Sequence, residues 1–292
     1  MGVLRLTLVP WAFPVISSSL VSDSFFRGGF KVAVGFVVVA LILLAGTLYM
    51  SVYYMKQEQQ LAETGDIEGA LEKARVAARF NPFDSMPLTV QANLLLRQGQ
   101  NDAAAEALRE AIDRDPASYA NLVYLANIQI NRLNEPEKAV KNYEAALEKN
   151  PRDTGLIFAL AQAYPRVGDL EAAKREYEKL VEFDKVPPRG LFNLGKIYVR
   201  TGDPEKGVET LQKAKERVSA GLERAEGAKR KEREAFVRSV DLALVDALVV
   251  EGRYDEAHAA LQQSDFEQAP ALLELLNTDP EAYRETVLDS EV

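Results

Sequence analysis

Hydrophobic and polar residues follow two different patterns along this chain. Residues Val32–Met50 read VAVGFVVVALILLAGTLYM, a run without a single charged side chain. This just reaches the ~20 apolar residues that a helix needs to cross a ~30 Å hydrocarbon core. Aromatic residues flank both ends, as they do at membrane interfaces. The pattern predicts a transmembrane helix over residues 30–54. A buried core helix usually has a polar face, and a signal peptide usually has a shorter apolar run, so both alternatives fit less well.

Downstream of this run the apolar positions follow a helical period, and the pattern repeats. Glycines separate amphipathic stretches at five positions: Gly65, Gly99, Gly168, Gly202 and Gly252. The interval between the first two equals that between the third and fourth, about 34 residues. The interval between the second and third is two such periods plus one position, which places a missing turn at Leu133-Asn134. The spacing predicts a series of helix-turn-helix units of one period each.

Aligning the chain on these turns reveals columns of similar residues. Small residues lie five positions after each turn: Ala70, Ala104, Ala139, Ala173, Gly207 and Ala257. Large ones lie nine positions after it, Leu108, Tyr143, Tyr177, Leu211 and Leu261, with Ala74 as the exception. Prolines follow at seventeen positions: Pro82, Pro116 and Pro151. Small residues allow two helix backbones to approach, large ones fill the space beside them, and proline ends the second helix.

This skeleton resembles the tetratricopeptide repeat, a helix-turn-helix unit of about 34 residues. The resemblance implies an all-α fold, a right-handed α-α superhelix of helical hairpins preceded by one transmembrane helix. The expected parts are a juxtamembrane segment (1–29), the transmembrane helix (30–54), five repeats (51–217), an elongated hairpin with a diverged sixth repeat (218–264) and capping helices (265–292).

The local signals at the helix ends fit this architecture. An aspartate follows three of the glycines, Asp66, Asp169 and Asp203, and is expected to cap the next helix. Nothing between Met50 and Gly65 breaks a helix, so one continuous helix, about 52 Å long, is expected from Phe30 to Thr64. The first repeat would then be held directly against the membrane.

The interval between the last two glycines is longer, about one and a half periods. The insertion is rich in helix formers, so we expect it to lengthen both helices of the hairpin by about two turns each. Gly221 and Gly227 should lie near the tip. The basic run Lys229–Lys231 is expected to be a solvated helix face, with contact to anionic lipid or an acidic partner as the alternative. Pro165 is expected to bend or shorten its helix.

The charge distribution limits the possible partners and suggests an orientation. The net charge is −9, and the charged residues of 1–55 are Arg5, Arg27, Lys31 and Asp23, a balance of +2, so residues 56–292 carry −11. Such a surface repels phosphate backbones, and no nucleic-acid partner is expected. The positive-inside rule places the short N-terminus in the cytoplasm and residues 56–292 outside a bacterial cell membrane. The margin is two or three charges, so a cytoplasmic repeat domain remains the alternative.

Candidate chemistry is sparse, which favours a binding role. The chain has no cysteine, His258 is its one histidine, and no phosphate-binding loop or serine triad stands out. We therefore expect neither an enzyme nor a cofactor, metal or small-molecule substrate. In the tetratricopeptide family, the first helices of successive repeats line a concave groove that holds a peptide or a partner helix. By register, the groove residues here are Asn93, Leu96, Arg97, Val123, Tyr124, Asn127, Asn131, Phe158, Gln162, Arg166, Phe192, Asn193, Lys196 and Arg200.

These residue types suit the recognition of a protein segment. Amides can pair with an extended peptide backbone, arginines with a carboxylate, and aromatic rings can anchor apolar side chains. The family's dicarboxylate clamp is not intact, because Thr89 and Val123 stand where it needs lysine. The leading interpretation is a membrane-anchored scaffold that recruits protein partners, at an envelope-assembly or secretion complex. The alternative is a structural subunit of a larger membrane complex whose groove is permanently filled.

Overall fold

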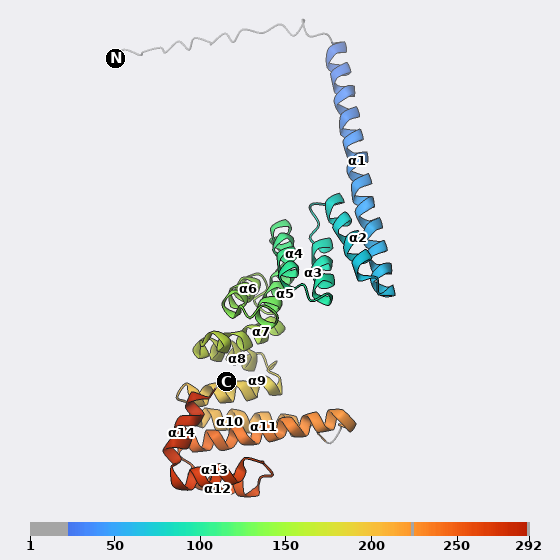
Figure 1. Ribbon diagram of the computed structural model, residues 1–292. Helices are drawn as coiled ribbons and strands as arrows, with labels where there is room; N and C mark the ends of the chain where they lie inside the picture. The colour runs from blue at the N-terminus through green and yellow to red at the C-terminus, as the bar shows by residue number, and fades with distance from the viewer. Residues whose placement is uncertain (1–22, 223–224, 291–292) are drawn as a thin grey trace, which may run out of the picture. The chain divides into compact units, whose positions relative to one another are not determined.

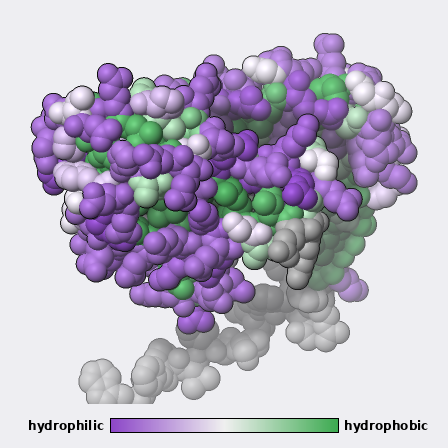
Figure 2. All heavy atoms as spheres, turned by 90° about the horizontal axis from the view of Figure 1, so that it is seen from below, coloured by the Kyte–Doolittle hydropathy of each residue, from purple (hydrophilic) through white to green (hydrophobic). Residues whose placement is uncertain are grey.

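The computed structural model describes residues 23–222 and 225–290, and every regular element in these ranges is a helix. Contacts divide the chain into two units, Met1–Asn81 and Pro82–Val292. Figure 1 shows a long helix followed by a short one in the first unit and a series of paired helices in the second. Hydrophilic side chains dominate the face seen in Figure 2, with hydrophobic ones in patches between them. Amphipathic helices that turn their apolar sides toward each other give such a surface.

The first unit consists of α1 (Asp23–Thr64) and α2 (Ile67–Phe80). α1 is one uninterrupted helix of 42 residues and begins at Asp23. The sequence placed its start at Phe30, so the structure adds about two turns at this end.

The two halves of α1 have different surroundings. No described residue packs around its apolar part, and the side chain of Phe36, for example, is 73% exposed. Its later part packs on α2, where the Ser51 hydroxyl donates to the Ala77 carbonyl at 3.0 Å and the Tyr54 ring stacks on Phe80 at 5.6 Å. Glu58 lies in this contact, and burial raises the pKa of its carboxyl. Glu58 is therefore a packed residue of the first repeat although it is acidic.

The second unit contains five helical pairs and two terminal helices. The elements, in order, are α3 (Met86–Arg97), α4 (Asn101–Arg114), α5 (Tyr119–Asn131), α6 (Pro136–Lys149), α7 (Thr154–Ala163), a 3₁₀ turn (Tyr164–Val167), α8 (Leu170–Glu182), α9 (Pro188–Arg200), α10 (Pro204–Ser219), α11 (Gly227–Glu251), α12 (Tyr254–Gln263), α13 (Ala269–Thr278) and α14 (Pro280–Asp289). Each odd-numbered helix from α3 to α11 packs on the next. The 3₁₀ turn contains Pro165, which shortens α7 as expected.

Left-handed residues end the first helix of every pair. The five glycines that mark the period have φ between 74° and 89°, and Asn134 takes the same role at the predicted missing turn with φ 52°. At the glycine turns the residue after the glycine donates back across five positions, as Gln100 N does to Leu95 O at 2.9 Å. At the asparagine turn the bond spans six positions, from Glu135 N to Gln129 O. The extra position in the sequence period is thus absorbed in this one turn.

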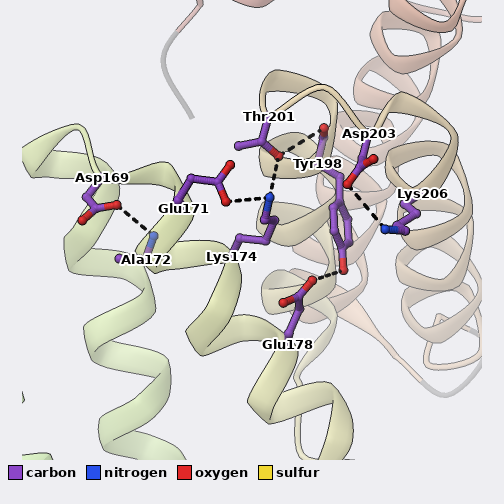
Figure 3. A network of polar contacts seen from close by, with 9 residues as sticks. All are labelled: Asp169, Glu171, Ala172, Lys174, Glu178, Tyr198, Thr201, Asp203 and Lys206. Atoms are coloured by element: carbon purple, nitrogen blue, oxygen red, sulfur yellow. Dashed lines mark hydrogen bonds and ion pairs between the residues drawn. The ribbon is translucent and has the colours of Figure 1, made fainter.

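The aspartate caps follow the prediction at two of three turns. The Asp66 side chain accepts from the Gly69 backbone N–H, and the Asp169 side chain accepts from that of Ala172 (Figure 3). The prediction for Asp203 is wrong, because this side chain makes no capping hydrogen bond to α10 and instead pairs with Lys206 at 3.4 Å.

The repeated columns form the core. Every small residue of the first column is buried, and so is every large residue of the second. The α9–α10 contact is close: a Cβ on Gly207 would lie 2.6 Å from Val199 Cγ2 and 3.0 Å from the Gly195 carbonyl oxygen. Glycine at these two positions is therefore what allows the two helix backbones to meet.

The insertion is not shared equally between two helices. α10 has 16 residues, close to the 14 of α6, whereas α11 has 25. α10 ends at Ser219, and Gly221 in the following turn lies close beside Arg233 of α11. α11 therefore takes most of the added length, and its first half projects past the end of α10 (Figure 1).

Polar contacts on the outer side of the repeats also follow the period. The Tyr198 hydroxyl donates to Glu178 Oε1 at 2.8 Å (Figure 3), and the Tyr164 hydroxyl donates to Glu144 Oε1 at 2.7 Å. The two pairs are one period apart, so the same bond joins α6 to the end of α7 and then α8 to α9. Burial and the neighbouring carboxylate raise the pKa of both phenols.

Candidate binding groove

Two hollows open along the first helices of the second unit, at the positions that the repeat register indicates. The first has a volume of about 520 Å³ and lies against α3 and α5. The second has a volume of about 830 Å³ and lies against α7, α9 and α11. Eleven of the fourteen groove residues predicted from the sequence line one or the other. Arg97, Val123 and Phe158 line neither of the two.

The first hollow is rich in neutral amides. Its lining is Thr89, Asn93, Leu96, Leu108, Tyr124, Asn127, Ile128, Asn131 and Arg132. Tyr143, from the second helix of the repeat, donates its hydroxyl proton to Asn127 Oδ1 at 2.8 Å, and burial raises the pKa of Tyr143 to about 12. Asn131 Nδ2 donates to the Asn127 carbonyl at 3.0 Å. The Asn127 amide is thus held in one orientation, with its Nδ2 group left to face a ligand, while the half-exposed Tyr124 ring offers an apolar surface.

The second hollow is cationic and aromatic. Its lining is Gln162, Pro165, Arg166, Gly168, Leu170, Tyr177, Arg189, Phe192, Asn193, Lys196, Arg200, Phe236 and Ser239. Asn193 Nδ2 donates to the Tyr177 hydroxyl at 2.9 Å, so the buried ring orients an amide here as well. Phe192 packs edge to face on Phe236 with ring centroids 5.5 Å apart. Four positive side chains and no carboxylate are among these lining residues.

Two of the predicted carboxylate-binding arginines already have hydrogen-bond partners. Arg166 donates to the Ile130 carbonyl at 2.8 Å and to Asn134 Oδ1 at 3.0 Å. Arg200 Nε donates to the Leu288 carbonyl at 3.1 Å. These acceptors are neutral, so both side chains are fixed in position while their charge is not cancelled by them. The arginines thus connect separate elements of the unit in addition to lining the groove.

The C-terminal helix contacts Arg200, a residue that lines the second hollow. The Tyr283 hydroxyl of α14 donates to Asp246 Oδ1 of α11 at 2.9 Å. Burial raises the pKa of Asp246 to about 6, while the bond from Tyr283 and the charge of Lys196 act in the opposite direction. Burial also lowers the pKa of Lys196, and the Asp246 charge partly offsets this. α14 therefore seals a carboxylate behind the cations of α9.

Several lining residues were missed in the sequence analysis. Arg189 lies one turn before Phe192 and Asn193 on the same face of α9, so extending that face by a turn would have found it. Phe236 lies on the inserted part of α11, six positions out of register with Phe192 when the chain is aligned on the glycine turns. No repeat alignment places it, and only the packing of α11 on α9 brings it to the hollow.

Comparisons with known proteins identify the repeat. A family model described as tetratricopeptide repeat matches residues 89–154 and 158–221, and a second model with the same description matches residues 239–263. Together the two models cover just over half of the chain. No curated protein matches the sequence significantly.

Solved structures show the same fold at low sequence identity. A tetratricopeptide repeat protein from Parabacteroides merdae has a TM-score of 0.56 and 16% identity, covering 82% of this chain and 90% of that one. MamA has a TM-score of 0.54 and 19% identity, covering 61% of this chain and 97% of its own. PilW, described as a widely conserved type IV pilus biogenesis factor, has a TM-score of 0.50 and 16% identity, with coverages of 82% and 98%.

Proposed function

Because the chain belongs to the tetratricopeptide repeat family, whose domains are scaffolds for protein–protein interaction, we propose that it is a membrane-anchored scaffold whose groove binds a peptide or a partner helix. Its role is binding rather than catalysis. The observation that carries the proposal is the pair of hollows along the first helices of the second unit, lined by oriented amides and aromatic rings. PilW, a pilus biogenesis factor by its description, illustrates the kind of envelope assembly that such a scaffold would serve.

The groove chemistry supports a peptide segment as the ligand. Asn127 and Asn193 are each fixed by a tyrosine, so they are already oriented toward a ligand's backbone groups and lose little side-chain entropy on binding. Amides both donate and accept, which matches the alternating groups of an extended chain. Tyr124 and Phe192 provide aromatic anchors in the two hollows.

The anchor in this proposal is the first half of α1. Residues 31–64 form a helix long and apolar enough to cross a membrane, and the described part of the protein buries none of its most apolar segment. The apolar side chains that it exposes would be stabilised in a bilayer, at roughly 25 cal/mol per Å² removed from water. A signal sequence near an N-terminus has the same composition, but here the apolar segment continues without a break into residues that pack on α2. This continuity favours an uncleaved span. The excess of basic residues before the span favours an N-terminus in the cytoplasm and repeats outside it.

The same continuity gives the first repeat a fixed attachment. Ser51 and Tyr54 pack on α2 immediately beyond the apolar run, so α1 is at once the span and the first helix of repeat one. Two glycines inserted after Met55 should uncouple the span from this repeat, because each adds flexibility and the insertion rotates all later residues by about 200°.

The groove can be tested by site-specific photo-crosslinking of the full chain in native membranes. A crosslinking amino acid at Tyr124 or at Gln162 points into a hollow, whereas the same amino acid at Glu106 or Arg175 lies on a second helix outside them. We expect Tyr124 and Gln162 to give discrete protein adducts. The control positions Glu106 and Arg175 should give none of these adducts. Equal adducts from all four positions would contradict groove binding.

The alternative function, a structural subunit with a permanently filled groove, predicts a different time course. An exchangeable ligand that is newly synthesised should become crosslinked to copies of the scaffold made before it, whereas a permanent one should crosslink only to copies assembled with it. Pulse labelling of the ligand therefore separates the two functions.

Carbonate extraction tests the anchor. Protease treatment of intact cells tests its orientation: digestion of residues 56–292 only after lysis would reverse the assigned topology.

A further inference from the structure

A third hollow lies beside the groove, on the side where α11 is lengthened. It has a volume of about 780 Å³ and is bounded by the start of α9, the end of α10 and the first half of α11. Its lining is Pro187, Pro188, Arg189, Arg217, Val218, Lys229, Glu232, Arg233, Ala235, Phe236 and Ser239. Those from Lys229 to Phe236 belong to the projecting part of α11, so the insertion in the repeat period forms one wall of the hollow.

This hollow adjoins the cationic hollow of the groove. The two share Arg189, Phe236 and Ser239 in their linings. They therefore form one surface, here named the cationic trough, which runs from α7 across α9 to the projecting part of α11. A repeat of regular length lacks the added turns of α11, so this trough is a feature of the present chain rather than of its repeat.

The charge of the trough is opposite to that of the chain. Among the described residues that line it, Glu232 is the one acidic side chain. Seven are basic: Arg166, Arg189, Lys196, Arg200, Arg217, Lys229 and Arg233. The chain as a whole carries −9. Positive side chains gathered in a concavity of an acidic protein raise the local concentration of anionic segments and increase their association rates.

Three of the trough's arginines are positioned by neutral groups. Arg166 and Arg200 donate to neutral oxygens, and the Arg189 guanidinium lies over the Phe236 ring at 5.9 Å. Arg217 differs, since it contacts the exposed carboxylate of Asp184 at 3.4 Å. A ligand that brings its own carboxylates would therefore meet three positioned donors without first displacing a strong ion pair from them.

We propose that the cationic trough binds an acidic segment of a partner protein, with carboxylates of that segment reaching the wall formed by Lys229 and Arg233. This inference rests on the proposed function, because the segment would enter from the same groove, and it specifies the chemistry of the ligand. The aromatic pair Phe192–Phe236 lines the trough, so apolar side chains between the acidic ones would be buried beside it.

A protein segment fits the trough better than other anionic partners. A lipid surface is broad and meets charges on a projecting face, whereas these charges line connected hollows. A nucleic acid extends beyond any one hollow, and the net charge of −11 over residues 56–292 would repel its backbone. The oriented amide of Asn193 adds a group suited to a peptide backbone.

The test measures binding of a fluorescent acidic peptide to the full chain in detergent micelles by anisotropy. The peptide has about twelve residues and alternates Glu with Phe and Leu, and a matched peptide carries Gln in place of Glu. The variant Lys229→Glu/Arg233→Glu reverses two charges of the trough wall. The control variant Lys231→Glu/Arg238→Glu makes the same change to the net charge on the same helix, at exposed positions outside the trough.

We expect the acidic peptide to bind, the Gln peptide to bind at least tenfold more weakly, and added salt to weaken the acidic peptide selectively. The trough variant should lose tenfold or more in affinity, and the control variant less than twofold. Equal losses in both variants would show a diffuse charge effect and overturn the proposal. All four positions are exposed, and unchanged helical circular dichroism verifies that each variant folds.

Two further outcomes separate this inference from the function beneath it. If groove crosslinks at Tyr124 and Gln162 persist but the acidic peptide does not bind, the acidic ligand is wrong while the scaffold function stands. If the acidic peptide fails and vesicles containing phosphatidylglycerol bind the chain through both pairs of basic residues alike, α11 is a lipid-facing helix and the proposal is overturned.

Discussion

Replacing Tyr177 tests how the second unit is held together and how its groove is formed. This ring is completely buried, packs edge to face on Phe158 with centroids 6.0 Å apart, and accepts a hydrogen bond from Asn193 at 2.9 Å. Two substitutions separate these contributions. Tyr177→Phe removes only the hydroxyl group, while Tyr177→Ala also removes the ring and leaves a cavity between α7, α8 and α9.

The expected magnitudes differ by a factor of about three to five. Removing a buried aromatic ring lowers the free energy of unfolding by about 3–5 kcal/mol, because the transferred surface and the cavity both contribute. Losing one neutral hydrogen bond lowers it by about 1 kcal/mol, and less here because Asn193 is half-exposed and can bond to water. For a unit of this size each ~1 kcal/mol corresponds to about 2–4 °C in Tm.

Denaturation of the full chain in detergent micelles, followed by circular dichroism, measures both variants. Hydrogen exchange then locates the effect, which should be largest in α7, α8 and α9 because each repeat mainly contacts its neighbours. Tyr124→Ala is the control: this ring is 48% exposed, so its removal should lower stability by less than about 1 kcal/mol. A loss below about 1 kcal/mol in Tyr177→Ala, or equal losses in the Phe and Ala variants, would refute the packing described for the ring.

Three other changes have defined outcomes. Gly168→Ala should lower the free energy of unfolding by about 1–2 kcal/mol in chemical denaturation, because φ is 79° and a Cβ there meets no other atom, so the loss is backbone strain alone. Tyr164→Phe and Tyr198→Phe should cost similar amounts, about 1–2 kcal/mol each, because their hydroxyls make the same bond one repeat apart; very unequal losses would contradict that equivalence. The carboxyl pKa of Asp246 is raised from 3.8 to about 6, so the folded state binds its proton more tightly than the unfolded state does. Stability should therefore fall as pH rises from about 4 through about 6, on the order of 1–3 kcal/mol, and Asp246→Asn should flatten this part of the urea-unfolding profile against pH.

The helical repeats could be predicted from the sequence because they depend on local chemistry that recurs. Gly65 and Gly168 take left-handed conformations where the period requires a turn, and Asn134 does the same at the position where glycine is missing. Asparagine tolerates this conformation better than other residues with a side chain, so a single turn could be located without a glycine. The buried columns follow for the same reason, since small and large residues at fixed offsets specify how the two helices pack.

The departures have causes that a repeat alignment does not contain. The sequence shows how long the insertion is but not its division between helices, which depends on where the chain turns between α10 and α11. Phe236 reaches the groove only through that uneven division. Likewise, Arg166 and Arg200 were expected to face a ligand, but contacts to Asn134 and to the C-terminal helix also define their positions.

The C-terminal helix illustrates how a solenoid end can shape a binding surface. α14 covers the last repeat with Tyr283, whose hydroxyl bonds to Asp246, and its final turn supplies a carbonyl oxygen to Arg200. A neutral oxygen holds the arginine without cancelling its charge, whereas the carboxylate behind the cations of α9 is buried and its pKa is raised. Were α14 absent, Asp246 would lose the Tyr283 bond and part of its burial, and Arg200 would lose the carbonyl oxygen that fixes its guanidinium group. The helix that caps the hydrophobic core therefore also positions one of the cations at this end of the cationic trough.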